Sequence, residues 1–397
     1  MIAIYTLTSE LHDEQAVGAV TNEFLSSLGI DYTLKGSDYT DYGNGEALSL
    51  IYVRTGGTEG IFKRLLPDLL AKAGRCPFYL LTSGKSNSLA ASMEILSYLR
   101  QQQLSGEILH GGPTYISHRI ALLEQTKKAR RQLAGCRLGI IGKQSDWLIS
   151  SHADRSTIKE RLGIELEDIP MQEVLDAIAK TSHSTVYTAH DDTAVGRSLP
   201  KALHIYEAVK AVVHSHKLQG FTLRCFDLLS TVHNTGCLAL AKLNAEGIVA
   251  GCEGDVPAML SMSLARALTG LSGFQANPAS IDTNTGSIVF AHCTIPLNMV
   301  ERYELDTHFE SGIGVGIRGY MKPGPVTVFK VSGDLSRHFI AEGELIENQA
   351  KQDLCRTQQL IRLKNKDSMA YFLTEPIGNH HIIVPGHRCE LFEELLK

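Results

Sequence analysis

The first third of the chain alternates short apolar runs with longer segments whose apolar residues recur at helical spacing. The apolar runs, which predict buried strands, are 2–7, 49–54 and 78–82. The segments that predict helices are 12–28, 59–73 and 87–103. Because strand–helix–strand alternation is typical of a parallel sheet covered by helices, we expect an α/β domain here.

The same alternation returns in the middle of the chain. A long helix is predicted at 113–135, and a new strand begins at Arg137. The elements predicted further on are a helix at 197–218, a strand at 220–226, a helix at 228–245, a strand at 247–252 and a helix at 256–270. The turn after the strand at Arg137 lacks the third glycine of a dinucleotide-binding loop, which favours a plain turn.

After about residue 285 the pattern changes to short strands separated by turns. The predicted strands are 287–293, 313–321, 325–332, 338–347, 357–364 and 369–374. They indicate a mostly antiparallel β domain. The expected fold class is therefore α/β, with two N-terminal Rossmann-like parallel-sheet domains, at 1–135 and 136–284, followed by a β-rich C-terminal domain at 285–397.

Composition narrows the class of protein. With 397 residues, 43% of them hydrophobic, the chain is too apolar for wholesale disorder. A net charge of −5 argues against a nucleic-acid partner. The sequence has no run of 18 apolar residues and no basic N-terminal region, so we expect neither a membrane span nor a signal peptide. Eight cysteines without a Cys-x-x-Cys pair favour a reducing compartment, and the cytoplasm is the expected location.

The sharpest chemical signal follows the strand predicted at 247–252. That strand runs directly into Glu253 and Asp255, with Gly254 between them, and a helix begins at once. In α/β sheets, ligands gather at the carboxyl ends of strands, so both carboxylates are candidates for catalysis and metal binding. The structural alternative is that Asp255 only caps the helix and Glu253 is a solvated loop residue.

Histidines and a third carboxylate also follow predicted strands. His292 ends one apolar strand, and His380 and His381 precede another. Since neighbouring strand residues point to opposite faces, His380 and His381 should not both face one site. Asp227 lies at the end of the strand before that of Glu253. The structural alternatives are hydrogen-bonded histidines, a polar edge strand and a helix cap.

Carboxylates combined with imidazoles form an oxygen and nitrogen donor set. Such a set suits Mn²⁺ or another divalent metal better than a thiolate site does. Cys252 and Cys293 adjoin the candidates, but their spacing fits no structural zinc pattern.

Three segments, in the same order along the chain, resemble the L-fucose isomerase and L-arabinose isomerase superfamily. Cys-Glu-Gly-Asp at 252–255 resembles its metal-site segment, and Ala-His-Cys-Thr-Ile-Pro at 291–296 resembles its next histidine segment. Asn-His-His at 379–381 resembles its C-terminal histidine segment. Lys-Pro-Gly-Pro-Val-Thr at 322–327 resembles a turn of short, fucose-isomerase-like members.

The resemblance implies a sugar ketol-isomerase, which is an intramolecular oxidoreductase. Such an enzyme interconverts the aldose and ketose forms of a monosaccharide through an enediol. The resemblance further implies a divalent metal, usually Mn²⁺, a small-molecule sugar as partner, and a homo-oligomer with sites near subunit contacts. It also implies two N-terminal α/β domains and a β-rich C-terminal domain.

Site residues carry over by position. Glu253 matches a metal-binding glutamate of the arabinose enzymes and Asp255 a metal-binding aspartate of the fucose enzymes, so which one binds metal and which is the base stays open. His292 matches a ligand of the arabinose type. His381 matches the C-terminal ligand, or His380 does if a gap is placed differently. Asp227 and His380 are the candidates for substrate binding.

The sequence also departs from the family pattern. The arabinose enzymes have a second glutamate where this chain reads Gln-Ala-Asn at 275–277, and the other fucose-type carboxylate falls near Gly236 or at Asp227. One acid/base carboxylate is therefore missing or displaced. This favours the main alternative, a non-catalytic sugar-binding or regulatory protein on the same fold. A third candidate, an NAD-dependent oxidoreductase, fits the α/β pattern but lacks the glycine fingerprint.

Overall fold

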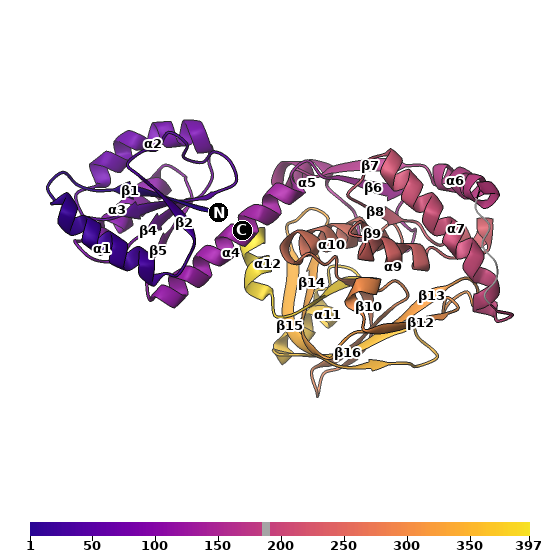
Figure 1. The fold of residues 1–397 in the computed structure, drawn as a ribbon. Helices are drawn as coiled ribbons and strands as arrows, with labels where there is room; N and C mark the ends of the chain where they lie inside the picture. The colour runs from indigo at the N-terminus through magenta and orange to yellow at the C-terminus, as the bar shows by residue number, and fades with distance from the viewer. Residues whose placement is uncertain (185–190) are drawn as a thin grey trace. The chain divides into compact units, whose positions relative to one another are not determined.

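The computed structural model describes residues 1–184 and 191–397 (Figure 1). It separates the chain into two compact units, Met1–Lys128 and Ala129–Lys397. The described strands form two parallel sheets, a closed antiparallel barrel and a two-stranded sheet, so the predicted α/β class with a β-rich C-terminal region is confirmed. The three-domain division at residues 135 and 284 stays a proposal.

The first unit is a parallel sheet with helices on both faces. Its elements are β1 (Ile2–Leu7), α1 (Glu14–Ser27), β2 (Tyr32–Gly36), β3 (Leu48–Val53), α2 (Glu59–Ala73), β4 (Phe78–Leu81), α3 (Ser88–Gln101), β5 (Gly106–Leu109) and α4 (Pro113–Leu133), which continues into the second unit. The strand order is β2-β1-β3-β4-β5. Alternate residues of β1 enter two cores: Ala3 and Tyr5 pack with α2 and α3, and Ile2 and Ile4 pack with α1 and α4.

The second unit begins with another parallel sheet. Its elements are β6 (Arg137–Ile141), α5 (Arg155–Leu162), β7 (Glu165–Ile169), α6 (Met171–Ser184), α7 (Ala194–Ser215), β8 (Gly220–Leu223), α8 (Asp227–Val232), α9 (Cys237–Ala245), β9 (Val249–Cys252) and α10 (Val256–Thr269). The strand order is β7-β6-β8-β9. Leu223 and Cys252, the last residues of β8 and β9, are register partners. The turns that follow these two strands therefore begin side by side.

An antiparallel barrel follows. The remaining elements are β10 (Phe274–Asp282), β11 (Ser287–His292), η1 (Leu297–Met299), β12 (Arg302–Asp306), β13 (Gly316–Tyr320), β14 (Gly324–Val331), β15 (His338–Gln349), β16 (Thr357–Leu363), η2 (Lys366–Ser368), α11 (Met369–Thr374), β17 (His381–Pro385) and α12 (Cys389–Leu396). The barrel order β10-β11-β16-β15-β14-β17 closes through the pairing of β10 with β17. Closure leaves no unpaired strand edge.

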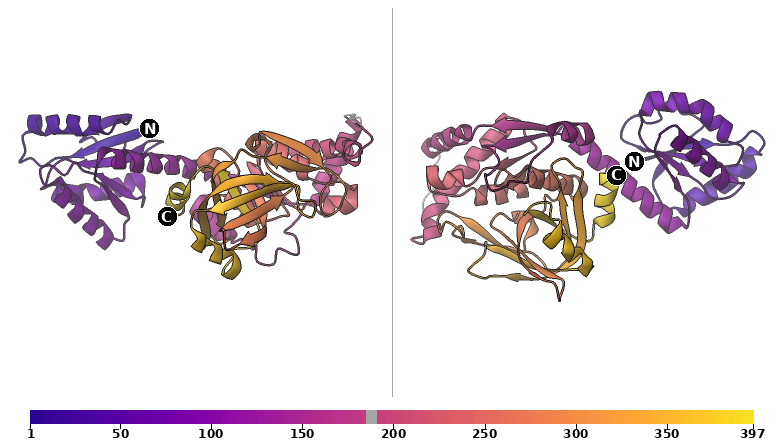
Figure 2. Two further views of the ribbon diagram at one scale, coloured as in Figure 1. Left: turned by 90° about the horizontal axis from the view of Figure 1, so that it is seen from below. Right: turned by 180° about the vertical axis from the view of Figure 1, so that it is seen from behind.

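Helix α10 lies between the four-stranded sheet and the barrel (Figures 1 and 2). It contacts β8 and β9 on the sheet side and β14 and β17 on the barrel side. Its residues are buried almost throughout, which explains a sequence with no polar face. The start of α10 is thereby held next to side chains from both layers.

Two predicted elements differ in the structure. The strand predicted at 369–374 is wrong, because these residues form helix α11. Asn365 starts the turn before it by accepting a hydrogen bond from the backbone N–H of Asp367, and the Met, Ala and Leu that follow are good helix formers. The single helix predicted at 228–245 is two helices, since His233 adopts a left-handed φ of 51° that ends α8.

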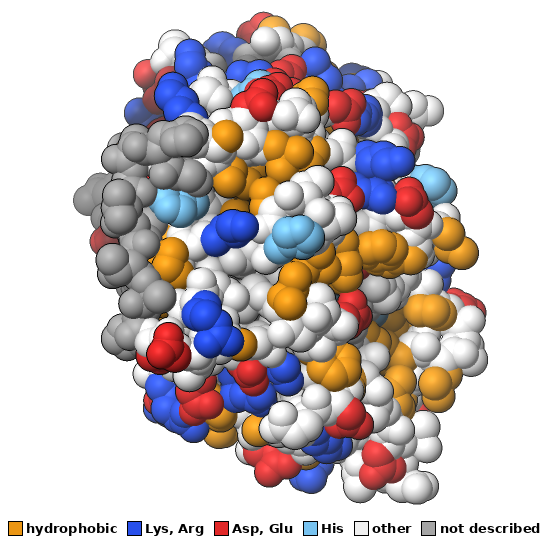
Figure 3. Space-filling view, turned by 90° about the vertical axis from the view of Figure 1, so that its right-hand side faces the viewer, with side chains coloured by type: hydrophobic (Ala, Val, Ile, Leu, Met, Phe, Trp, Pro, Cys, Tyr) orange, Lys and Arg blue, Asp and Glu red, His pale blue; other side chains and the backbone are white. Residues whose placement is uncertain are grey.

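Among the described residues, no helix has both the length and the apolarity that a bilayer crossing requires. On the face drawn in Figure 3, Lys and Arg side chains lie among Asp and Glu side chains, with hydrophobic side chains grouped between them. The described side chains of this face thus carry both signs of charge.

His216, at the end of helix α7, pairs with one glutamate on β7 and one on α6. His216 lies 2.8 Å from Glu173 and 2.7 Å from Glu167, and its hydrogen bonds to Glu173 and Glu167 raise its pKa. A raised pKa stabilises the fold below about pH 6.5, the unfolded value, and this stabilisation is lost as the pH rises through the folded value. We therefore expect His216→Gln to lower the free energy of unfolding more at pH 6 than at pH 9, as measured by urea unfolding. An equal loss at both pH values would contradict this assignment.

Candidate metal centre

A strained turn after β9 sets the position of the first candidate ligand. Glu253 and Gly254 both adopt left-handed backbone angles, with φ of 64° and 69°. Asp255 then caps α10 by accepting a hydrogen bond from the backbone N–H of Ala258 at 2.8 Å. A left-handed φ is costly for a glutamate, so the surrounding structure must enforce it.

Gly254 leaves no room for a side chain. A Cβ atom at this position would lie 2.3 Å from the carbonyl oxygen of Lys143. We expect Gly254→Ala to lower the free energy of unfolding by at least about 2 kcal/mol, because it adds this overlap to the cost of the left-handed φ. Gly270→Ala is the matched control, since Gly270 has a similar φ of 80° and no atom within 4 Å of its Cβ position. Thermal unfolding that shifts equally in both variants would contradict the steric argument.

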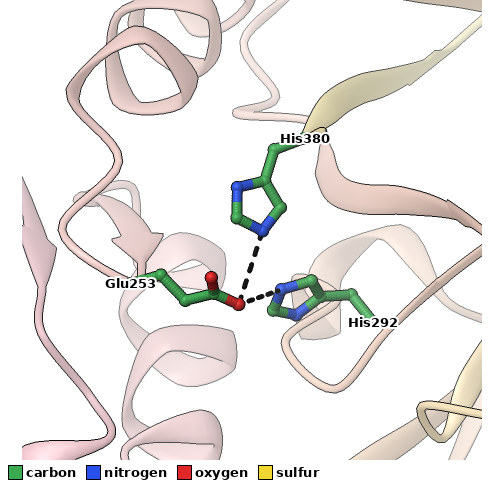
Figure 4. Close-up of side chains that lie close together, drawn as sticks. All are labelled: Glu253, His292 and His380. Atoms are coloured by element: carbon green, nitrogen blue, oxygen red, sulfur yellow. Dashed lines mark ion pairs between the residues drawn. The ribbon is translucent and has the colours of Figure 1, made fainter. Parts of the chain in front are cut away.

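Three buried side chains converge beyond this turn (Figure 4). Nε2 of His292 lies 3.6 Å from Oε1 of Glu253, and Nε2 of His380 lies 3.5 Å from the same oxygen. The ligand atoms all lie within 4.8 Å of one another. Glu253 comes from the end of β9, His292 from the end of β11 and His380 from the residue before β17, so the sheet and the barrel together build the group.

Hydrogen bonds fix the orientation of both imidazoles. Nδ1–H of His380 donates to Oδ2 of Asp255 at 2.8 Å. Nδ1 of His292 shares a hydrogen bond with the hydroxyl of Thr294 at 3.1 Å. Each Nδ1 is thus occupied, and each Nε2 faces Glu253. Metal-binding histidines commonly have the other ring nitrogen held by such a hydrogen bond, often to a carboxylate, as Asp255 holds His380.

Charges within the group shift the pKa values in opposite directions. Burial raises the pKa of Glu253, but His380 and His292 outweigh this and hold it well below its usual range. Burial lowers the pKa of His380, but Glu253 and Asp255 outweigh it and raise the pKa to about 9. Burial likewise raises the pKa of Asp255, while Lys330 and His380 bring it below its usual value. Both carboxylates are therefore ionised at neutral pH.

His381 lies apart from the group. Its Nδ1–H donates to the carbonyl oxygen of Asn379 at 3.0 Å, and its Nε2 is 2.9 Å from the hydroxyl of Tyr371. Burial, followed by the charge of Lys330, lowers its pKa to about 3, so the ring is neutral. Both ring nitrogens are engaged, which leaves no lone pair for a metal. The opposite-face argument separated His380 from His381, and the structure turns His380 toward Glu253.

Asp227 is also held elsewhere. Its Oδ1 accepts a hydrogen bond from Nε of Arg224 at 2.9 Å, in the first turn of α8. Arg224 also pairs with Asp146 at 2.8 Å. The structure therefore brings together Glu253, His292 and His380, with Asp255 behind them, but neither Asp227 nor His381.

Several residues close to Glu253 lie outside the motifs that the sequence singles out. Trp147 donates its Nε1–H to Oε2 of Glu253 at 2.7 Å. Phe226 packs edge-on against Trp147, with ring centroids 4.9 Å apart, and against His308 at 5.6 Å. This chain of rings places the loop that contains His308 and Glu310 near the carboxylate. Desolvation raises the pKa of Glu310, and the charge of Glu253 raises it further.

Gln275 occupies the region where the resemblance places a second glutamate. It is buried, and its amide oxygen accepts a hydrogen bond from the backbone N–H of Cys252 at 2.8 Å while its amide nitrogen donates to the Cys252 carbonyl at 3.3 Å. A neutral amide in this position supports the strand end that precedes Glu253, but it cannot transfer a proton.

The donor set fits a divalent metal. Nε2 of His380 is buried and has no hydrogen-bond partner in the described part of the chain, so its position calls for a ligand. One carboxylate oxygen and two imidazole nitrogens suit a divalent transition metal better than Ca²⁺ or Mg²⁺, which prefer oxygen. Three protein ligands leave coordination positions open for substrate, as in catalytic rather than structural sites.

Comparison with known proteins bears on the class of reaction and not on the metal. No family model matches the chain. The chain is 24% identical over 266 residues to sulfoquinovose isomerase of Priestia aryabhattai, covering 62% of this chain and 59% of that protein. It is 24% identical over 225 residues to sulfoquinovose isomerase of Clostridium sp. (strain MSTE9), covering 54% and 49%. The chain is thus similar to proteins that are each named as a sugar isomerase. The match to the sulfoquinovose isomerase of Alkalicoccus urumqiensis is 22% over 265 residues, and none of these matches reaches two thirds of the relative's length.

Proposed function

We propose that the chain is a metal-dependent aldose–ketose isomerase that acts on a monosaccharide by an enediol proton transfer. The observation that carries the proposal is the convergence of Glu253, His292 and His380 at the junction of sheet and barrel. The relatives, each named as a sugar isomerase, support the same reaction class. Proton transfer between neighbouring carbons needs an acid or base beside a group that stabilises the developing negative charge.

In this proposal, Glu253, His292 and His380 hold the metal. A divalent ion at this site, which we propose to be Mn²⁺, supplies Lewis-acid polarisation of the sugar carbonyl. Trp147 donates a hydrogen bond of 2.7 Å to the second oxygen of Glu253 and so helps to fix the orientation of the carboxylate. Asp255 acts on His380 rather than on substrate, because it is fully buried.

Proton transfer is assigned to a carboxyl other than these. Glu310 is exposed on its loop, so a sugar can reach it. Its pKa is raised, first by desolvation and then by the charge of Glu253, and a raised pKa brings a carboxylate closer to the value that suits a general base near neutral pH. We propose that the Glu310 carboxylate accepts the proton from the carbon next to the carbonyl, which gives the enediol, and returns it to the former carbonyl carbon, while the neighbouring hydroxyl passes its proton to the former carbonyl oxygen.

The substrate is tested first with the sugar of the relatives. We propose to incubate the Mn²⁺-loaded protein with sulfoquinovose and with a panel of neutral aldoses that includes L-fucose and L-arabinose, and to follow conversion to the ketose by NMR. Conversion of any panel member that needs Mn²⁺ supports the isomerase. Binding of a sugar, measured by calorimetry, without conversion of any would contradict it.

Binding without conversion would instead support a sugar-binding or regulatory protein on the same fold. The neutral Gln275, in the region of a family glutamate, is the observation that favours this second candidate. A homo-oligomer remains a proposal from the family resemblance. Eight free cysteines support a reducing compartment such as the cytoplasm.

A further inference from the structure

A lysine is buried where the barrel meets α10. On β14, Val326 and Val328 belong to the hydrophobic core of the barrel, and Lys330 follows at the same two-residue spacing. Lys330 is fully buried, and its Nζ makes no hydrogen bond to any described residue. A buried cation is expensive unless it is paired, and an apolar residue would pack here at lower cost. We therefore expect an interaction that offsets the cost of burying this lysine.

The charged group that Lys330 meets is Asp255. Nζ of Lys330 lies 3.6 Å from Oδ2 of Asp255, and both side chains are fully buried. The same Oδ2 accepts the hydrogen bond from His380, while Oδ1 accepts the one from the backbone of Ala258. Asp255 is thus the common partner of a lysine on β14, the histidine before β17 and the start of α10.

We propose that Lys330 is a positioning residue for the metal centre, acting through Asp255 to hold His380 with its Nε2 toward Glu253. This inference rests on the metal site of the proposed function. Asp255 is buried two residues from Glu253, which is also a carboxylate. The positive charge of Lys330 offsets the negative charge of Asp255. Lys330 thereby holds in place the carboxylate oxygen that accepts the hydrogen bond of His380. Substitution of a residue that holds a metal ligand in this way typically lowers metal affinity by about 10 to 100-fold.

The test measures Mn²⁺ affinity directly, without activity. Free Mn²⁺ is followed by electron paramagnetic resonance while the metal is titrated into the EDTA-stripped chain. We expect Lys330→Met, which keeps the volume and removes the charge, and Asp255→Asn each to weaken binding by about 10 to 100-fold. Tyr371→Phe is the control, because Tyr371, on α11, packs against the core of the barrel and bonds to His381 instead of His380. It should bind Mn²⁺ as the native chain does.

A double variant separates positioning from a general loss of structure. If Lys330 acts only through Asp255, the variant Asp255→Asn/Lys330→Met binds Mn²⁺ as Asp255→Asn does. Because the double variant removes both buried charges, it can still be measured if Lys330→Met alone, which leaves Asp255 without its cation, fails to fold. Native-like affinity of Lys330→Met, or a difference of more than about fivefold between the double variant and Asp255→Asn, would overturn the inference while leaving the metal site standing. A native chain that binds no Mn²⁺ would overturn both.

Discussion

His380→Gln is expected to weaken Mn²⁺ binding by more than about 100-fold, beyond the range typical of outer residues, whereas His381→Gln leaves it within about threefold. Nε2 of His380 lies 3.5 Å from Oε1 of Glu253 and is free of other bonds to described residues. Both ring nitrogens of His381 are engaged by Asn379 and Tyr371. The two adjacent histidines therefore serve as controls for each other in one titration.

The effect of His381→Gln is expected in the thermal stability of the protein. Because it removes a ring packed among aromatic side chains of the barrel, it should lower the unfolding temperature without changing metal affinity. The opposite pattern, in which His381→Gln loses metal and His380→Gln keeps it, would contradict the assignment of His380 and restore His381 as the C-terminal ligand.

Glu253→Gln is expected to lose both metal and turnover. The carboxylate is the one anionic member of the ligand group, and a Lewis-acid metal contributes several kcal/mol to stabilising the developing charge. We expect kcat/KM for isomerisation to fall by a factor of roughly 1,000 or more, and Mn²⁺ affinity to fall with it. The measurements are NMR kinetics and the Mn²⁺ titration.

Glu310→Gln is the matched variant, since it removes a carboxylate that we assign to proton transfer rather than to the metal. It should keep Mn²⁺ affinity and lose kcat. If Glu310→Gln retained turnover, the base would have to be sought elsewhere. If Glu253→Gln retained Mn²⁺, the ligand role of Glu253 would be refuted.

Strand ends in the sequence predict candidate site residues, while the structure shows which of these side chains converge. The sequence predicts Glu253 and His292 as candidates because each is a polar residue at the carboxyl end of a buried strand. The pair at 380 and 381 could be split by strand alternation, but not assigned, since the choice depends on which face of β17 meets α10. That face is fixed by the pairing of β17 with β10 and β14, which no local pattern encodes.

Other neighbours of the site depend wholly on tertiary contacts. Lys330 continues an alternating apolar strand, where a lysine ordinarily marks the solvent side, so its burial cannot be read locally. Trp147 reaches Glu253 across 106 positions of sequence. At 369–374 the sequence predicts a strand where the structure has a helix, because six residues are too few to separate the two periodicities.

The most direct measurement of the central claim is metal-dependent hydrogen exchange. The EDTA-stripped protein is incubated in D₂O with a panel of aldoses and ketoses, with and without Mn²⁺, and deuterium at C1 and C2 is followed by NMR. Exchange needs only the proton-transfer step, so it detects a sugar that is turned over poorly. We expect Mn²⁺-dependent deuteration of at least one sugar that vanishes in Glu253→Gln. No deuteration of any sugar by a chain shown to bind Mn²⁺ would contradict the isomerase.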